Sequence, residues 1–274
     1  MKKLSRYATS AGPRWMLDGQ PLVASFTLAE LLRQPASTLS DWLARRRDDA
    51  ASGIQAQTVL PPIEPLQEVW ASGVTYLRSR DARKAESSVA DVYQKVYEAE
   101  RPELFMKAVG WRVVTGGQPV RIRKDSQWNV PEPELTLVIN THGEIVGYTA
   151  GNDMSSRDIE GENPLYLPQA KIYTGACALG PEIVLVDAEA MRALTVTLEI
   201  RRNGAVVFSG ETNIARMKRR LEELVSYLYR ELDFPDGTFL MTGTGIVPPE
   251  SFSLQPGDQV KISVGAVTLE NDVA

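Results

Sequence analysis

Cysteine and histidine are nearly absent from this chain of 274 residues, which contains one of each. The lone cysteine, Cys177, excludes an internal disulfide and fits a reducing cytoplasm. The lone histidine, His142, excludes zinc sites built from several histidines. Because His142 lies in a predicted turn at residues 140–144, we expect it on the surface rather than in a Ser-His-Asp triad. The side chains that remain as candidates for metal binding and catalysis are mainly those with oxygen atoms.

Features of membrane and nucleic-acid proteins are also missing. No window approaches the roughly 18 consecutive apolar residues of a membrane span, and no apolar stretch follows the basic N-terminus, so we expect no secretory signal. The formal net charge is -5. The arginine-rich runs at residues 45–47 and 219–220 lie beside acidic residues in helical patterns, which is typical of a solvated face. No Walker A, G-x-G-x-x-G or G-x-S-x-G pattern occurs. We therefore expect a soluble cytoplasmic protein that binds neither membrane nor nucleic acid.

A proline-rich stretch divides the chain into two predicted parts. Residues 1–66 are predicted to form a small N-terminal domain, with short helices at residues 28–33 and 39–47. The stretch LPPIEP at residues 60–65 indicates a linker, because proline removes a backbone donor and restricts the residue before it. Residues 67–274 then form the predicted catalytic domain.

Strand patterns dominate after residue 110. Two apolar runs, residues 135–139 and 144–149, flank a turn and predict a β-hairpin, and an Asn-Gly pair at residues 203–204 predicts a second hairpin. Further predicted strands occupy residues 182–186, 194–200, 205–208, 260–264 and 267–269. Many strands with few helices indicate the α+β class, mostly β, arranged as a rolled sheet or sandwich.

Two helical patterns lie within this part of the chain. Apolar residues recur at steps of three and four from Ile214 to Leu232, which predicts one long amphipathic helix packed on the core. Residues 80–98 also follow a helical pattern but are mostly polar. Such a stretch forms either a lid over a site or a surface helix, and the sequence favours neither.

Two glutamates, Glu132 and Glu134, are held in an extended chain by Pro131 and Pro133. Side chains at positions i and i+2 of an extended chain share a face, with Cα atoms about 6.6 Å apart. Carboxylates that close repel each other unless a cation lies between them. A Glu-x-Glu pair alone most often marks a solvated strand face, but the prolines and the apolar run that follows favour a metal site here.

A third carboxylate, Asp153, follows the second strand of the predicted hairpin, whereas Glu132 and Glu134 precede the first. Because a hairpin brings its two ends together, the three side chains are expected to meet. Their hard oxygen ligands favour Mg²⁺, Mn²⁺ or Ca²⁺ over zinc. The alternative interpretation of Asp153 is an Asx turn. For the neighbouring Arg157 and Asp158, the preferred interpretation is a structural ion pair.

Five motifs occur in the order typical of the fumarylacetoacetate hydrolase family: GVTY (73–76), PEPE (131–134), GNDMSSRD (151–158), QAK (169–171) and TGTG (242–245). The resemblance covers roughly residues 70–274 and implies a mixed β-roll. It also implies that Glu132, Glu134 and Asp153 hold a divalent cation, and that the family lysine is Lys171. The family threonine that binds a substrate carboxylate corresponds to Thr244. The resemblance further implies a homodimer or a dimer of dimers.

Within that family, the chain looks closest to the 2-keto-3-deoxy-D-arabinonate dehydratase branch. The residues behind this are RPELFMK (101–107) and RDIEGENPLYLPQAK (157–171). Hydrolase members resemble G-x-N-Y-x-x-H, in which the histidine helps to activate water. Here Thr75 replaces that asparagine and Ser79 replaces that histidine, which puts hydrolysis in doubt.

The resemblance implies a Mg²⁺-dependent dehydratase, with Mn²⁺ or Ca²⁺ as alternative ions. It would convert a 2-keto-3-deoxy-pentonate into 2,5-dioxopentanoate through a metal-stabilised enolate. Lys171 is the candidate base or enolate stabiliser, since a nearby cation lowers the pKa of a lysine; its alternative role is a structural partner of a site carboxylate. Thr244, in a glycine-flanked loop, should hold the substrate carboxylate. Glu86 is the candidate proton donor to the departing hydroxyl, and Tyr76 and Lys107 are expected to line the pocket.

Two other functions stay open. The first is a different reaction of a 2-oxo acid on the same metal site, either acylpyruvate hydrolysis or oxaloacetate decarboxylation. The second is a non-catalytic metal-binding or interaction protein with the same fold. The presence of Lys171 together with all three carboxylates argues against this second alternative.

Overall fold

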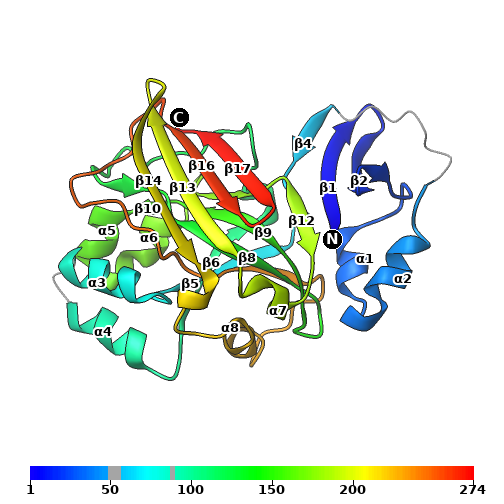
Figure 1. The fold of residues 1–274 in the computed structure, drawn as a ribbon, viewed down its shortest axis with the longest axis horizontal. Coiled ribbons are helices and arrows are strands. Elements are labelled where there is room, and N and C mark those ends of the chain that lie inside the picture. Colours follow the sequence, from blue (N-terminus) through cyan, green and yellow to red (C-terminus); the bar gives the residue numbers. More distant parts are fainter. Residues whose placement is uncertain (49–56, 87–89) are drawn as a thin grey trace.

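The computed structural model describes residues 1–48, 57–86 and 90–274, and two β-sheets dominate it (Figure 1). The larger sheet is mixed and runs in the order β3 (Gln20–Pro21), β2 (Gly12–Leu17), β1 (Lys2–Thr9), β12 (Glu182–Leu185), β9 (Ile145–Asp153), β8 (Pro133–Ile139), β15 (Thr238–Met241), β5 (Glu68–Gly73) and β6 (Glu103–Val109). Two further strands join it, β4 (Thr58–Leu60) beside β1 and β11 (Cys177–Leu179) beside β9. The predicted α+β class, mostly β with a mixed sheet, is confirmed.

The smaller sheet is antiparallel and covers one face of the larger one. Its order is β14 (Ala205–Asn213), β13 (Thr195–Arg202), β16 (Gln259–Val264) and β17 (Val267–Asp272). Alternate residues of β13 are buried, as expected for a strand with one face on a core. Leu198 and Ile262 of this sheet pack in one buried cluster with Leu137 and Tyr148 of the larger sheet. The main core therefore lies between the two sheets.

The N-terminal segment is joined to the larger sheet rather than separate from it. β1 pairs antiparallel with β12, from Lys2 opposite Leu185 to Ser5 opposite Glu182. The two short helices predicted in this segment are confirmed as α1 (Leu28–Leu32) and α2 (Leu39–Ala44). The domain boundary at residue 66 stays a prediction.

Most of the remaining elements lie near the open end of the β8–β9 hairpin, whereas the helix at residues 188–191 lies near its turn. They are a two-stranded sheet of β7 (Asn129–Val130) and β10 (Ser155–Ser156), and the helices α3 (Leu77–Glu86), α4 (Ala90–Glu98), α5 (Arg157–Glu162), α6 (Leu167–Lys171) and α7 (Ala188–Met191). In Figure 1 the helices α3 to α6 lie at the end of the molecule away from the N-terminal segment. Both predicted hairpins, β8–β9 and β13–β14, are present, and His142 is exposed between β8 and β9. Among the described helices, none combines the length and the hydrophobicity that a membrane span requires.

The long helix predicted from Ile214 to Leu232 is wrong. The chain forms a 3₁₀ turn at Ile214–Arg216, leaves the helical conformation at Met217, and forms only a short helix, α8 (Leu221–Leu228). Two long-range contacts interrupt the periodic pattern. Met217 forms a β-bridge with Tyr76, and the N–H of Lys218 donates to the carbonyl of Thr75 at 3.0 Å. Tertiary pairing with the loop after β5 therefore overrides local helix propensity here.

Candidate active site

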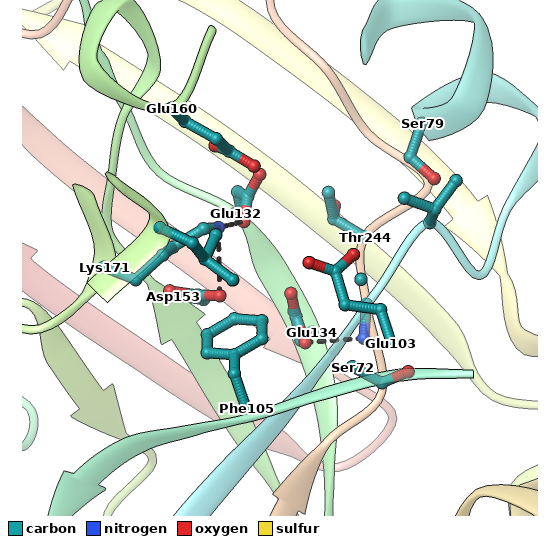
Figure 2. A pocket seen from close by; sticks show the side chains of 14 residues that line it. Ser72, Ser79, Glu103, Phe105, Glu132, Glu134, Asp153, Glu160, Lys171 and Thr244 are labelled. Atoms are coloured by element: carbon teal, nitrogen blue, oxygen red, sulfur yellow. Dashed lines mark hydrogen bonds and ion pairs between the residues drawn. The ribbon is translucent and has the colours of Figure 1, made fainter. Parts of the chain in front are cut away.

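Three carboxylates converge at the open end of the β8–β9 hairpin. Antiparallel pairing places Glu134 opposite Gly151, and the N–H of Asp153 donates to the carbonyl of Glu132 at 3.0 Å. Oxygen atoms of Glu132, Glu134 and Asp153 all lie within 4.8 Å of one another, and the three residues are at most 3% exposed. The structure thus brings together the three carboxylates that were predicted from the sequence to meet, as Figure 2 shows.

Buried basic side chains surround two of these carboxylates. The ammonium of Lys171 contacts Glu132 and donates to Asp153 Oδ2 at 3.1 Å. Arg157 Nη2 lies 2.6 Å from Glu132 Oε1, and Lys107 Nζ lies 2.5 Å from Asp153 Oδ1. Each basic group is at least 97% buried, so solvent screens these pairs weakly. The basic groups hold the carboxylates of Glu132 and Asp153 in place and offset part of their charge.

The predicted ion pair between Arg157 and Asp158 is not formed. Arg157 instead pairs with Glu132 and lies 3.6 Å from Glu160, one helical turn further along. Asp158 accepts hydrogen bonds from the Ser126 hydroxyl at 2.6 Å and from the Gln127 N–H at 2.7 Å. Adjacent residues point to different sides of the chain, which is why Arg157 faces the site and Asp158 faces a neighbouring loop.

Glu134 has a different environment from the other two carboxylates. Its oxygen Oε2 accepts a hydrogen bond from the backbone N–H of Gly243 at 2.6 Å. Burial, and next the negative charges of Asp153 and Glu132, raise the pKa of Glu134 well above its ordinary value. A divalent cation among the three oxygens would remove this repulsion. The buried, mutually repelling oxygen ligands therefore fit a hard divalent cation.

A cavity opens directly above the carboxylates, and the space between its lining side chains is about 340 Å³, including the part that is open to solvent. Figure 2 shows Lys171 and Glu160 on one side of it and Glu103, Ser79 and Thr244 on the other. The lining residues are Ser72, Gly73, Val74, Ser79, Glu103, Phe105, Glu132, Glu134, Asp153, Glu160, Leu167, Lys171, Gly243 and Thr244. The lining thus combines apolar side chains with acidic and basic groups that face each other.

Two loops form one wall of the cavity and are hydrogen-bonded together. The hydroxyl of Thr75, in the loop after β5, donates to the carbonyl of Thr242, in the loop after β15, at 2.6 Å. Val74 has a φ of 54°, and a β-branched residue in this region is strained by roughly 1–3 kcal/mol. Gly243 has a φ of 91° and lies close to Thr75. Val74 and Gly243 both line the cavity, so these unusual backbone conformations lie directly at the site.

The structure distributes the other predicted site residues in three ways. Lys171 and Thr244 line the cavity. Tyr76 and Lys107 are 2% and 1% exposed but are not among its lining residues, so their contact with substrate stays a prediction. Burial, followed by the charge of Glu134, raises the pKa of the Tyr76 phenol. Glu86 ends α3, and its side chain lies outside the part of the chain that the structure describes.

Among the cavity residues that sequence reasoning missed are two on one strand, Glu103 and Phe105. Both belong to β6, and their spacing of two residues places them on the same face of that strand. The signal was present, because both lie in the motif RPELFMK used above for the resemblance. What the motif could not reveal was that β6 pairs with β5 and so reaches the site.

Comparison with known proteins agrees with this geometry. The sequence model described as "Fumarylacetoacetate (FAA) hydrolase C-terminal" matches residues 68–274. A protein of Haloferax volcanii named "Probable 2-keto-3-deoxyxylonate dehydratase" is 44% identical over 248 residues, which is 90% of this chain and 85% of that protein. A "2-dehydro-3-deoxy-D-arabinonate dehydratase" of Saccharolobus solfataricus is 44% identical over 236 residues, which is 80% of this chain and 78% of that protein.

Solved structures show the same similarity. The structure described as "2-keto-3-deoxy-D-arabinonate dehydratase complexed with magnesium and 2,5-dioxopentanoate" is 36% identical, with a TM-score of 0.85, and covers 99% of this chain and 98% of that one. A fumarylacetoacetate hydrolase from Exiguobacterium antarcticum has a TM-score of 0.72 at 22% identity, covering 100% of this chain and 99% of that one, and shares the fold. The chain belongs to the fumarylacetoacetate hydrolase family.

Proposed function

We propose that the protein is a Mg²⁺-dependent dehydratase that converts a 2-keto-3-deoxy-pentonate into 2,5-dioxopentanoate and water. The observation that carries this proposal is the buried triad of Glu132, Glu134 and Asp153 beneath a cavity that also exposes Lys171 and Glu103. Relatives at 44% identity named as dehydratases of this substrate class support the choice of reaction.

The three carboxylates would hold the magnesium ion. Their oxygens are hard ligands at short mutual distances, and the related solved structure contains magnesium. Bound there, the cation supplies Lewis-acid polarisation of the substrate's 2-oxo group, which acidifies the protons at carbon 3. Burial of the carboxylates keeps bulk water from competing for this position.

Proton transfers are assigned to the two ionisable groups that face each other across the cavity. Lys171 is on the side of Glu132 and Asp153, and we assign to it removal of a proton from carbon 3. Glu103 lies on the opposite side, and we propose it, in place of Glu86, as the group that protonates the departing hydroxyl of carbon 4. Loss of water is followed by proton shifts that yield the aldehyde at carbon 5. Thr244, on the same wall as Glu103, is proposed to bind the substrate carboxylate.

Ser79 argues against hydrolysis on this platform. It stands at the position where the hydrolase pattern has histidine, and its hydroxyl is engaged with the backbone of Tyr76. The hydroxyl donates to the carbonyl of Tyr76 at 2.8 Å and accepts from the N–H of Tyr76 at 3.3 Å. A hydroxyl held in this way caps the start of α3, and among the described side chains it has no basic partner with which to activate water.

The substrate class leaves one stereochemical choice. Once carbon 2 is a ketone and carbon 3 a methylene, a five-carbon sugar acid retains a stereocentre only at carbon 4. The arabinonate and xylonate names of the two relatives therefore denote the same carbon skeleton. We propose that the cavity between Lys171 and Glu103 discriminates between the two configurations at carbon 4.

The proposal is tested by incubating the Mg²⁺-loaded protein with both enantiomers of 2-keto-3-deoxy-pentonate and following aldehyde formation by proton NMR. The expected result is 2,5-dioxopentanoate from one enantiomer, lost on chelation and restored by added Mg²⁺. Acylpyruvate and oxaloacetate are assayed in parallel. Efficient cleavage of either compound without dehydration of the pentonate would replace this proposal with the corresponding hydrolase or decarboxylase.

A cytoplasmic location and a homodimer or dimer of dimers belong to the same proposal, as does a catalytic unit spanning residues 67–274. The reduced, 2%-exposed Cys177 supports the location. Cell fractionation tests the location, and light scattering of the purified protein tests the assembly. Expression of residues 67–274 tests whether that unit folds without β1, which pairs with β12.

A further inference from the structure

Lys107 is a basic side chain buried at the back of the carboxylate cluster. Its ammonium is 2.5 Å from Asp153 Oδ1, donates to the carbonyl of Met154 at 3.0 Å, and donates to the carbonyl of Lys171. The residue is 1% exposed. Burying an ammonium is costly unless its hydrogen bonds are satisfied. Here two backbone carbonyls accept hydrogen bonds from the ammonium, and the carboxylate of Asp153 forms an ion pair with it.

The backbone at Lys107 is arranged to send the side chain inward. β6 pairs with β5 from Glu103 to Val109, but the register shifts between Val69 and Trp70, so that Lys107 has no partner on β5. An extra residue in one strand is a β-bulge, and bulges redirect a side chain relative to its neighbours. From this position Lys107 reaches the end of β9 and the end of α6 together.

We infer that Lys107 is a positioning residue of the active site, which acts through Asp153 and Lys171 and does not touch substrate. This inference rests on the proposed function, because it takes Asp153 as a metal ligand and Lys171 as the base. One ammonium orients the carboxylate of Asp153 at its Oδ1 atom and anchors the backbone carbonyl of Lys171. It therefore sets the spacing between the ligand and the base.

The contacts favour this role over the substrate contact expected from the sequence. Among the described residues, the Lys107 ammonium pairs with Asp153, Met154 and Lys171, and Lys107 does not line the cavity. Lys171, by contrast, both lines the cavity and contacts the carboxylates. The two lysines thus hold Asp153 from different sides, one facing the cavity and one facing the protein.

The test compares Lys107→Met with Lys261→Met, which removes an exposed lysine on the smaller sheet. Three properties are measured: the Kd for Mn²⁺ by electron paramagnetic resonance, the thermal midpoint, and the kcat and KM of the Mg²⁺-loaded enzyme. We expect Lys107→Met to weaken Mn²⁺ binding by about 10- to 100-fold, as loss of a group that orients a ligand does. Its kcat at saturating Mg²⁺ should fall by at least about tenfold, with a smaller change in KM.

Each other outcome overturns the inference in a recognisable way. A lower thermal midpoint with unchanged Kd and kcat would make Lys107 a stabilising residue only. A rise in KM alone would indicate that Lys107 contacts the substrate. Tighter Mn²⁺ binding would indicate that Lys107 affects the cation only by charge repulsion. If the wild-type protein binds no Mn²⁺, the proposed function fails instead. Should Lys107→Met not fold, Lys107→Gln replaces it in the comparison. This variant removes the positive charge but keeps an amide that can still donate hydrogen bonds.

Discussion

The backbone N–H of Gly243 donates to Glu134 Oε2 at 2.6 Å, so the loop that carries Thr244 is attached directly to one of the three carboxylates. The same loop accepts the Thr75 hydroxyl at the carbonyl of Thr242. Two segments far apart in sequence therefore meet over Glu134. Small changes in this loop should reach both substrate binding and the metal site.

Replacing Gly243 by alanine tests that attachment. Gly243 has a φ of 91°, and a Cβ there would approach the Thr75 hydroxyl and lie 3.0 Å from the carbonyl oxygen of Ser72. We expect Gly243→Ala to lower the free energy of unfolding by about 2–3 kcal/mol and kcat/KM by at least tenfold, roughly the effect of strain plus a shifted ligand. Gly257→Ala is the matched control, because Gly257 has a φ of 88° and no atom within 4 Å of the added Cβ. Equal losses in both variants would mean that positive φ alone, and not contact with the site, accounts for the effect.

Asp153 is expected to dominate divalent-ion binding. Asp153→Asn should weaken Mn²⁺ binding by roughly 100-fold or more, because an amide brings no charge to the cation. Asp158→Asn provides a matched control with the same chemical change, since Asp158 contacts Ser126 and Gln127 and not the triad. Titration calorimetry with Mn²⁺ measures both. Comparable loss of affinity in the two variants would exclude Asp153 as a specific ligand.

Divalent-ion affinity should depend on pH through Glu134. Burial and the nearby carboxylates raise the pKa of Glu134, so its protonated form persists to higher pH than that of an ordinary glutamate. In the metal-free protein this group is destabilising when ionised. That destabilisation is relieved as the pH falls through the raised folded pKa. Because the cation needs the ionised form, binding must release a proton, and affinity should fall as the pH decreases through the raised pKa.

Proton release is measured by Mg²⁺ titration calorimetry in two buffers of different ionisation enthalpy. The difference in apparent heat should grow as the pH is lowered toward the raised pKa of Glu134. In Glu134→Gln, the proton release assigned to this group should disappear. Heats of the wild-type protein that are independent of buffer at every pH would contradict the assignment.

Lys171 is expected to be needed for chemistry but not for holding the cation. Lys171→Met should lower kcat by about 10²- to 10⁴-fold, the usual contribution of a general base. Its Mn²⁺ affinity should change far less than kcat, because the loss of its contacts with Asp153 and Glu132 is offset by removal of a positive charge beside the cation. Turnover is measured by aldehyde formation and binding by paramagnetic resonance. Retained turnover would return Lys171 to its alternative role, a structural partner of the carboxylates.

How far the fold could be predicted depended on the range of the interactions involved. The β8–β9 hairpin follows from two apolar runs and a short turn, all within a few residues of each other. The sequence predicts it, although both strands extend further toward the open end than expected. The end of the helical stretch after Ile214 was not predicted, because the Met217–Tyr76 bridge joins residues far apart in the chain. A periodic apolar pattern shows that a segment packs on a core, but not where a partner strand interrupts the helix.

The same division applies to the site. By itself the sequence determined that Glu132, Glu134 and Asp153 meet. Side chains two residues apart on an extended chain share a face, and a hairpin brings its two ends together; both rules are local and need no knowledge of packing. Only the tertiary structure decided that β6 brings Glu103 and Phe105 to the cavity, that Arg157 turns to Glu132 rather than Asp158, and that Lys107 reaches Asp153 from behind. Those placements depend on how separate elements pack against the hairpin, and packing is set by the burial of the whole chain rather than by any one motif.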